Sequence, residues 1–398
     1  MYCTRKVNDD YTWVGADCRR LALFEGVFGV PDGISFNSSL LTDEMTVRFD
    51  TVDSAVRRTF RENLAHALAG RELDYIVVHH MEPDHAAELA DLAKDYPKAQ
   101  FMCSAMAKTM VGQFFGPEVA GRITVIKEGD TLCTGRHTLR FVAAPMVHWP
   151  EVMMTYDETD KLLLSADAFG CFGALNGAYI DAEMNCDIYW DEMLRYYSNI
   201  VGKYGTPVQQ ALKKLAGVKM DYICSTHGPV WHEHIERVVG MYDRLSRYEG
   251  ADGLVIAYAS MYGNTERAAE VIARAASEAG VKNIIMHDVS RTHHSYIIAD
   301  IFRYRALILG APTYNNGLYP QMESLLSELA GRDMKNRLLG WFGSFSWAGK
   351  AMKTIGEWNE TRLHFEPVGT PVEIKQSLDD ATTRACEELG RAMGERLL

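Results

Sequence analysis

The stretch His80-Met81-Glu82-Pro83-Asp84-His85 directly follows an apolar run, Leu73 to Val78, that predicts a buried strand. Its two imidazoles and two carboxylates place four candidate metal-binding groups at one strand end. Imidazole suits zinc, copper, iron and nickel alike, whereas carboxylate oxygen shifts the preference toward harder ions. The mixture favours iron or manganese, as a single ion or a pair, over a zinc thiolate site.

The spacing within this stretch allows its polar side chains to converge. Alternate residues of an extended chain point to the same side, so His80, Glu82 and Asp84 can face one way. Pro83 is suited to the first turn of a following helix, which would fix the geometry. His85 would then point toward a different position from His80. Because burying these groups without a metal would be costly, we expect a metal site here.

Three other apolar runs in the same half of the chain also end on a candidate ligand. These runs and their final residues are 141–147 with His148, 161–166 with Asp167, and 222–226 with His227. Any one of these residues alone is more often a structural or surface residue than a ligand. Together with the 80–85 stretch, they are consistent with two ions bridged by one carboxylate, an arrangement that leaves no buried charge unpaired.

The chain has 398 residues, a length at which two domains are the default expectation. A polar, Gly-rich break at 248–253 predicts domains 1–249 and 250–398. The net charge of −12 argues against nonspecific binding to nucleic acid or to an anionic membrane. The N-terminus lacks the apolar core of a secretory signal, and no apolar run approaches the roughly 20 residues of a membrane span. We therefore expect a cytoplasmic protein.

The eight cysteines are scattered singly and form no C-x-x-C pair. Such a pattern predicts neither a zinc ribbon nor a thioredoxin-like site, and we expect no disulfide framework. Any redox chemistry must then come from a metal or an organic cofactor.

The two halves of the chain differ in their strand and helix patterns. In the first half, strands are expected at 46–50, 73–78, 100–103, 138–144, 161–166 and 221–225, with helices at 54–69 and 84–94. This pattern indicates an α/β sandwich of mixed sheets. The second half alternates strictly, with strands at 254–259, 284–287, 306–310 and 338–342, helices at 266–279 and 322–329, and a range, 374–397, that includes the closing helix. Alternation predicts a doubly wound parallel sheet with its ligand at the carboxyl ends of the strands.

Three loops of the second half follow expected strands and carry Gly, hydroxyl, amide and aromatic residues. They are Ser260-Met261-Tyr262-Gly263-Asn264-Thr265, Pro312-Thr313-Tyr314-Asn315-Asn316-Gly317 and Ser344-Phe345-Ser346-Trp347. The first can wrap a phosphate with backbone N–H groups at a helix N-terminus, and it resembles the phosphate loop of flavodoxins. It matches neither the dinucleotide nor the nucleoside triphosphate fingerprint. The resemblance extends to the other two loops and implies FMN, although Phe345 and Ser346 stand where Tyr and Gly are usual.

The complete set of motifs resembles the flavodiiron proteins. The H-x-E-x-D-H stretch carries Glu82 where zinc-binding metallo-β-lactamases have a second His, and it is accompanied by Met146 to Pro150, Ala166 to Gly170 and Thr226 to Gly228. The resemblance implies a metallo-β-lactamase-like first domain and a flavodoxin-like second domain. It also implies one iron held by His80, Glu82 and His148, another held by Asp84, His85 and His227, and Asp167 bridging them. His85 is the ligand least expected to be bound in every redox state. Tyr196 and Tyr197 resemble a tyrosine pair near the site of the family, and core packing explains that pair equally well.

For function, the resemblance implies reduction of dioxygen to water, nitric oxide to nitrous oxide, or both, with electrons passing through FMN. The electrons would come from an external donor such as rubredoxin, a reduced deazaflavin or a reductase. The family assembles as a head-to-tail homodimer, or a dimer of dimers, which we expect here as well. Two alternatives are a metal-dependent hydrolase of the metallo-β-lactamase superfamily and a noncatalytic flavin electron carrier. Glu82 and the flavin loops count against the first, and a complete ligand set counts against the second.

Overall fold

The computed structural model describes residues 1–398, which divide into two compact units. The first unit comprises Met1–Tyr197 and Tyr204–Asp243, and the second comprises Ser198–Lys203 and Arg244–Leu398. The division of the chain into domains 1–249 and 250–398 stays a prediction. None of the helices is both long and apolar enough to cross a membrane.

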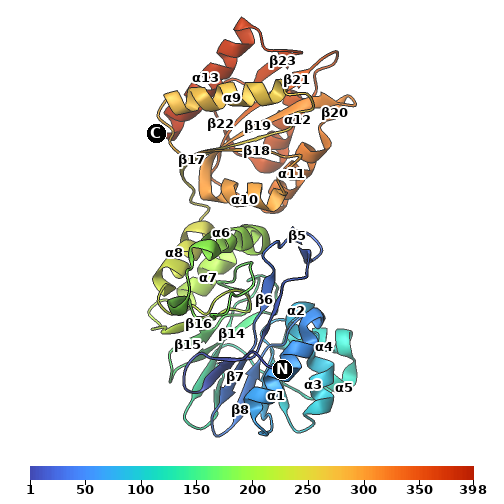
Figure 1. Ribbon diagram of the computed structural model, residues 1–398, viewed down its shortest axis with the longest axis vertical. Coiled ribbons are helices and arrows are strands. Elements are labelled where there is room, and N and C mark those ends of the chain that lie inside the picture. The colour runs from blue at the N-terminus through green and yellow to red at the C-terminus, as the bar shows by residue number, and fades with distance from the viewer. The chain divides into compact units, whose positions relative to one another are not determined.

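The first unit contains two main sheets with helices outside them (Figure 1). In the seven-stranded sheet the order is β1 (Arg5–Lys6), β2 (Tyr11–Trp13), β7 (Ser39–Thr42), β8 (Thr46–Phe49), β9 (Tyr75–Val77), β10 (Gln100–Cys103) and β11 (Ile123–Val125). In the five-stranded sheet the order is β12 (Thr131–Cys133), β13 (Thr138–Ala143), β14 (Met153–Asp157), β15 (Leu162–Leu164) and β16 (Tyr222–Cys224). Two small hairpin sheets pair β3 (Ala16–Cys18) with β6 (Ile34–Phe36) and β4 (Leu23–Phe24) with β5 (Phe28–Gly29). Both main sheets mix parallel and antiparallel pairs, which is the α/β sandwich expected from the sequence.

Helices flank each of the two main sheets. Those beside the first sheet are α1 (Arg57–Leu68), α3 (Leu89–Asp95), α4 (Ala105–Phe115) and α5 (Pro117–Gly121), and those beside the second are α6 (Asp187–Tyr196), α7 (Gly205–Leu215) and α8 (Ile235–Ser246) (Figure 1). The helix expected at 84–94 is divided into α2 (Pro83–Ala86) and α3, because the helical hydrogen bonding is interrupted around Glu88. Pro83 is the first residue of α2, a position at which its missing N–H costs nothing.

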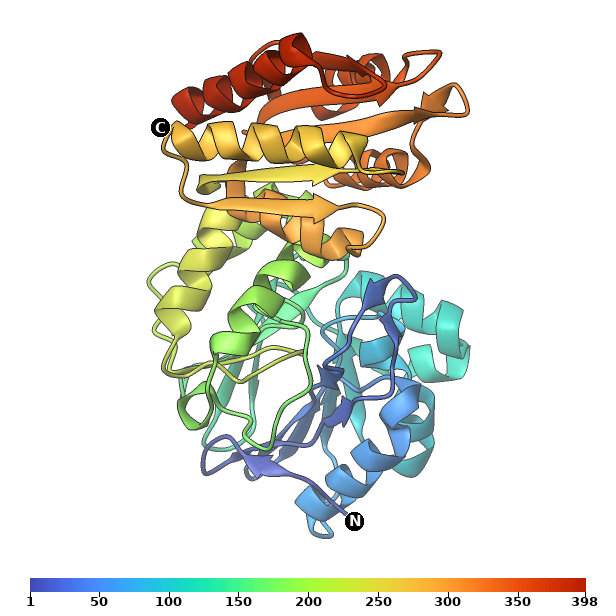
Figure 2. The same cartoon turned by 45° about the horizontal axis from the view of Figure 1, so that its top comes forward.

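The second unit contains a parallel sheet with the order β18 (Ile284–Asp288), β17 (Ala251–Tyr258), β19 (Tyr304–Tyr314), β21 (Leu338–Phe345) and β22 (Glu366–Pro367). β23 (Val372–Lys375) also pairs with β21, and the short β20 (Gly317–Leu318) turns back against β19. Helices α9 (Asn264–Glu278) and α13 (Asp380–Leu397) cover one face, and α10 (His294–Arg303), α11 (Pro320–Gly331) and α12 (Ala351–Trp358) cover the other (Figure 2). This is the doubly wound sheet expected from the strict alternation.

The core of the second unit shows why its strands read as continuous apolar runs. Leu254, Ile256 and Ile308 are buried on the face of the sheet that α9 and α13 cover. The residues that alternate with them along each strand are buried on the opposite face. The range 374–397 includes the closing helix, as expected: the helix itself begins at Asp380, and Ile374 lies in β23. Asp379 caps that helix by accepting the Thr382 N–H at 2.8 Å.

Candidate functional site

Four loops of the first unit meet where strands of both main sheets end. The loop after β9 belongs to one sheet, and the loops after β13, β15 and β16 belong to the other. They bring together all the metal-binding residues expected from the sequence, in two groups: His80, Glu82, His148 and Asp167; and Asp84, His85 and His227. Within each group the candidate ligand atoms all lie within 4.8 Å of one another.

In the first group a carboxylate oxygen lies between two imidazoles. Glu82 Oε2 is 3.2 Å from His80 Nε2 and 3.1 Å from His148 Nε2. Asp167 Oδ2 is 3.3 Å from each of the same two nitrogens. Two nitrogen and two oxygen atoms thus face one common point.

The second group has the same chemistry on the other side of Asp167. Asp84 Oδ1 lies 3.3 Å from His85 Nε2, and Asp84 Oδ2 lies 3.3 Å from His227 Nε2. Asp167 Oδ1 is 3.1 Å from His85 Nε2 and 3.5 Å from His227 Nε2. The two oxygens of Asp167 therefore face different groups, which is the arrangement of a carboxylate between two ions.

Several ligand atoms of the second group are buried without a hydrogen-bond partner. They are both carboxylate oxygens of Asp84 and the Nε2 atoms of His85 and His227. A buried polar atom that lacks a partner costs about 1–3 kcal/mol, and more for a charged group. Cations at these positions would satisfy all four atoms at once, so the residues fit a metal centre.

A third cluster in this unit provides a contrast. Asp10, His137 and Asp160 also approach one another, but their polar atoms are engaged by protein groups. Arg136 binds Asp10, Asn8 donates to Asp160 at 2.9 Å, and Asp157 contacts His137 Nδ1 at 2.6 Å. We therefore assign no metal to this cluster.

The carboxylates and imidazoles of the centre stabilise each other's charged forms. Burial opposes the charge on His148, but hydrogen bonds to Asp167 and Glu82 outweigh it and raise its pKa to about 9. Burial likewise opposes ionisation of Glu82, but hydrogen bonds from His148 and His80 lower its pKa to about 2. The pKa of Asp167 is held well below its usual range, because nearby His85, His148 and His80 outweigh the effect of burial. The site therefore favours positive charge next to ionised carboxylates.

Further buried groups contact the candidate ligands from outside. Glu151 Oε1 lies 2.7 Å from His80 Nδ1, His227 Nδ1 lies 2.7 Å from the Ser35 carbonyl oxygen, and Thr226 donates to Asp167 Oδ1 at 2.6 Å. Reasoning from the sequence missed Glu151. Its only signal is that it lies three residues after His148 in the same loop.

The two tyrosines expected near the site have different surroundings. The Tyr196 ring lies 5.6 Å from the His227 ring and 5.1 Å from the Phe172 ring. Tyr197 instead packs edge-on against Tyr242 at 4.8 Å. The pKa of the Tyr196 hydroxyl is raised well above its usual value by burial and by the charge of Asp167. Of the pair, Tyr196 is the residue placed beside the metal centre.

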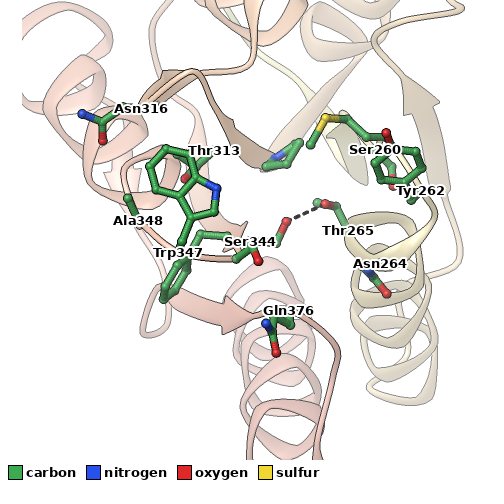
Figure 3. Close-up of a pocket in the computed structure, with 14 residues that line it drawn as sticks. Ser260, Tyr262, Asn264, Thr265, Thr313, Asn316, Ser344, Trp347, Ala348 and Gln376 are labelled. Carbon is green, nitrogen blue, oxygen red and sulfur yellow. Dashed lines mark hydrogen bonds between the residues drawn. The ribbon is translucent and has the colours of Figure 1, made fainter.

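The second unit has a cavity of about 370 Å³ at the carboxyl ends of β17, β19 and β21 (Figure 3). Its lining comes from all three expected loops: Ser260, Met261, Tyr262, Asn264 and Thr265; Pro312, Thr313 and Asn316; and Ser344, Phe345, Ser346 and Trp347. Ala348, which directly follows Trp347 in the third loop, also lines it, as does Gln376, which was not expected. Gly263, Tyr314, Asn315 and Gly317 do not line it.

The first of these loops has the form of an anion cradle. Ser260 Oγ accepts the Gly263 N–H at 3.1 Å, and Gly263 adopts a φ of 90° immediately before α9 begins. The N–H groups of the first turn of α9 have no partners within the helix, and the helix dipole favours negative charge there. A phosphate fits this position.

Hydrogen bonds between loops hold the rest of the cavity in shape. The Thr265 and Ser344 hydroxyls lie 2.8 Å apart (Figure 3). Thr313 Oγ1 accepts the N–H groups of Lys350 and Ala351 at 2.9 and 3.1 Å. Trp347, which lines the cavity, is 80% exposed. An exposed aromatic ring beside a phosphate cradle fits a flat, ring-containing ligand such as a flavin.

Comparisons with known proteins agree with both sites. Residues 34–228 match the family model of the ODP family beta lactamase, and residues 256–390 match that of flavodoxin. The chain is 32% identical to rubredoxin-oxygen oxidoreductase of Megalodesulfovibrio gigas, covering 93% of this chain and 92% of that protein. It is 31% identical to the anaerobic nitric oxide reductase flavorubredoxin of Shigella flexneri, covering 98% of this chain and 82% of that protein.

Solved structures show the same likeness over the whole chain. Rubredoxin oxygen:oxidoreductase from the anaerobe Desulfovibrio gigas superposes with a TM-score of 0.94 at 29% identity, covering 99% of this chain and 98% of that one. A flavoprotein of Thermotoga maritima superposes with a TM-score of 0.90 at 26% identity, covering 99% of this chain and 98% of that one.

Proposed function

The chain belongs to the flavodiiron proteins, and we propose that the residues described above build its diiron centre and its FMN site. It is an oxidoreductase that reduces dioxygen to water, nitric oxide to nitrous oxide, or both. The observation that carries the assignment is the position of Glu82 Oε2, between the His80 and His148 nitrogens at 3.2 and 3.1 Å. A carboxylate there hardens a site that would otherwise suit zinc.

His80, Glu82 and His148 would hold one iron, and Asp84, His85 and His227 would hold the other, with Asp167 shared between them. The division of the ligand atoms into two groups and the opposite directions of the two Asp167 oxygens support this assignment. The partnerless atoms of Asp84, His85 and His227 support it as well.

FMN would lie in the cavity of the second unit, with its phosphate at residues 260–265 and its ring system beside residues 312–317 and 344–347. When bound, the flavin supplies the exchange between two-electron and one-electron transfer, and the irons supply one-electron chemistry to a small diatomic substrate. We assign residues 1–249 to the metal domain and residues 250–398 to the flavin domain.

The protein's own residues contribute orientation and enclosure. The ligand side chains are almost entirely buried, so little water competes for the positions they face. Hydrogen bonds from outside, such as that from Thr226 to Asp167 at 2.6 Å, fix the direction of individual ligand atoms.

Electrons come from an external protein donor of the rubredoxin type, in keeping with the family. A reduced deazaflavin or a reductase is an alternative source. We also propose a head-to-tail homodimer, in which the flavin of one chain serves the irons of its partner. Two-fold assembly is the commonest form of oligomer.

The function is tested by metal analysis and substrate consumption on one anaerobic preparation. We expect two irons and one FMN per chain, and rapid consumption of dioxygen or nitric oxide when reduced rubredoxin is supplied. Bound zinc together with no consumption of either gas would contradict the proposal and favour a hydrolase.

A further inference from the structure

Glu151 is a fully buried carboxylate that no part of the proposed ligand set uses. Its Oε1 lies 2.7 Å from His80 Nδ1 and accepts the Met81 backbone N–H at 2.9 Å. Both contacts are made to residues of the 80–85 stretch, from a loop of the other main sheet. The Glu151 side chain therefore contacts a candidate iron ligand on the side away from the metal centre.

This geometry determines which nitrogen of His80 carries the proton. A carboxylate only accepts hydrogen bonds, so His80 Nδ1 must donate to Glu151 Oε1. In the neutral ring, which is the form that binds a metal, the lone pair of His80 then lies on Nε2, which faces Glu82 Oε2 at 3.2 Å and Asp167 Oδ2 at 3.3 Å. The tautomer that can bind a metal within the first group is the one that Glu151 selects.

In the second group, the outer nitrogen of His227 contacts a neutral carbonyl instead of a carboxylate. His227 Nδ1 lies 2.7 Å from the carbonyl oxygen of Ser35. A negatively charged acceptor polarises an imidazole N–H more strongly than a carbonyl does, which makes the opposite nitrogen a stronger electron donor. The two metal positions, each with two imidazoles and one carboxylate of its own, differ in this respect.

We infer that Glu151 is a positioning residue that strengthens His80 as a ligand, so that the ion held by His80, Glu82 and His148 is the more firmly bound and the more easily oxidised of the two. This inference rests on the proposed diiron function. It predicts that removing the charge of Glu151 affects one iron and leaves the other unchanged.

Asp50, which follows β8, provides a matched control because its carboxylate contacts His79, the residue before His80. Its Oδ1 accepts the His79 backbone N–H at 2.7 Å, and its Oδ2 lies 2.6 Å from His79 Nδ1. Asp50 thus contacts one backbone N–H and one imidazole, as Glu151 does. The His79 ring, however, points to Thr155 Oγ1 at 2.7 Å and not into the metal centre. Asp50→Asn and Glu151→Gln each remove one buried charge, and only the second removes a hydrogen bond to a proposed ligand.

The test measures iron release from the diferrous protein to a chelator, together with a reductive titration followed by electron paramagnetic resonance. In Glu151→Gln we expect one of the two irons to leave roughly 10–100-fold faster than in the wild type and the other to leave at the wild-type rate. One of the two one-electron steps should move to a higher potential. In Asp50→Asn both release rates and both steps should match the wild type.

Three outcomes would overturn the inference: unchanged release in Glu151→Gln, equal loss of iron from both variants, or a metal-free Glu151→Gln protein that fails to fold while metal-free Asp50→Asn folds. The last two would assign Glu151 to support of the loop alone. A wild-type protein without two irons would instead refute the proposed function, which keeps the two failures distinct.

Discussion

At residue 82 this chain has a carboxylate where zinc-binding proteins of the same fold have an imidazole. The structure gives that difference a location, because Glu82 Oε2 lies between His80 and His148 within the first group. The residues at 80, 84 and 85 are the same as in the zinc-binding motif, so Glu82 is the one position of the stretch at which the two motifs differ. We therefore expect Glu82 to be the side chain that shifts the first group from zinc toward iron.

Replacing that side chain should change the metal. In Glu82→His we expect the first group to prefer zinc, because imidazole suits zinc and the remaining ligands are unchanged. Elemental analysis of protein expressed with both metals should show the iron content falling by about half, since the Asp84, His85 and His227 group is intact. Oxygen consumption should fall by two orders of magnitude or more, on the order of the loss that even outer contacts of a metal can cause. Full iron loading in this variant would contradict the role given to Glu82.

A second prediction at this scale concerns Asp50 and the pH dependence of stability. Burial raises the pKa of the Asp50 carboxyl, but the charge and hydrogen bonds of His79 outweigh burial and hold that pKa below its usual range. A depressed pKa contributes stability that is fully present above the unfolded-state pKa of about 3.9 and is lost as pH falls through the folded-state value.

Asp50→Asn should therefore lower the stability of the metal-free protein by about 1–3 kcal/mol at pH 7. The difference from the wild type should persist to pH 5 and shrink below pH 4. Thermal unfolding at several pH values, followed by tryptophan fluorescence, measures it. A difference that grows as the pH falls would show that Asp50 is neutral in the folded protein.

At the scale of helices and strands, the sequence predicted the elements whose residues alternate or run apolar without interruption. β9, β13, β15 and β16 were expected within a few residues of their actual bounds, and each delivers a ligand at its end. The strands before residue 46 were not predicted, because they are only two to four residues long and carry too little periodicity. The interruption between α2 and α3 was also missed, since Ala86 to Leu89 has no Gly or Pro to mark it.

The same limits explain which site residues were found. The ligands lie next to their strands in sequence, so the strand pattern together with the 80–85 stretch and the family resemblance located them. Glu151 and Gln376 reach their sites through tertiary contacts: Glu151 contacts His80 from the other main sheet, and Gln376 follows β23, a strand that was not predicted. Tyr314, Asn315 and Gly317 do not line the cavity: β19 continues to Tyr314 and pairs with β20 across a turn at Asn315 and Asn316, of which only Asn316 lines it.

Gly263 tests the phosphate cradle at this scale. Its φ of 90° is a conformation that costs a residue with a Cβ atom about 1–2 kcal/mol, so Gly263→Ala should shift the loop and its N–H groups. We expect FMN to bind about tenfold more weakly in this variant, as measured by quenching of flavin fluorescence.

Gly280→Ala is the matched control. Gly280 has a φ of 102° just beyond the other end of α9, far along the helix from the cavity. Gly280→Ala should lower thermal stability by about as much as Gly263→Ala does, and it should leave the affinity for FMN unchanged. Equal weakening of FMN binding in both variants would mean that the cradle plays no specific part.

At the scale of the whole molecule, the proposed head-to-tail dimer predicts complementation between defective chains. One variant, His227→Ala, should lose iron from the second group, and the other, Gly263→Ala combined with Thr265→Val, should lose FMN. Each homodimer should be inactive. After the two are unfolded and refolded together, a mixed dimer places the intact flavin of one chain beside the intact irons of the other.

We expect the mixture to recover about a quarter of the wild-type activity per chain, because random pairing makes half of the dimers mixed and each of these has one working pair of sites. Oxygen consumption and light scattering on the same sample measure activity and size together. An inactive mixture of confirmed dimers, or a wild-type monomer with full activity, would contradict the proposed assembly.

The central claim, that the two groups of ligands hold irons which reduce a diatomic gas, is tested most directly by stopped-flow spectroscopy. Anaerobically reduced protein containing iron and FMN is mixed with dioxygen and, separately, with nitric oxide, and the flavin absorbance is followed. We predict fast reoxidation by at least one of the gases, lost when the iron has been removed and the FMN retained. Reoxidation at the same rate with and without iron would contradict the account, because the flavin alone would then explain the reaction.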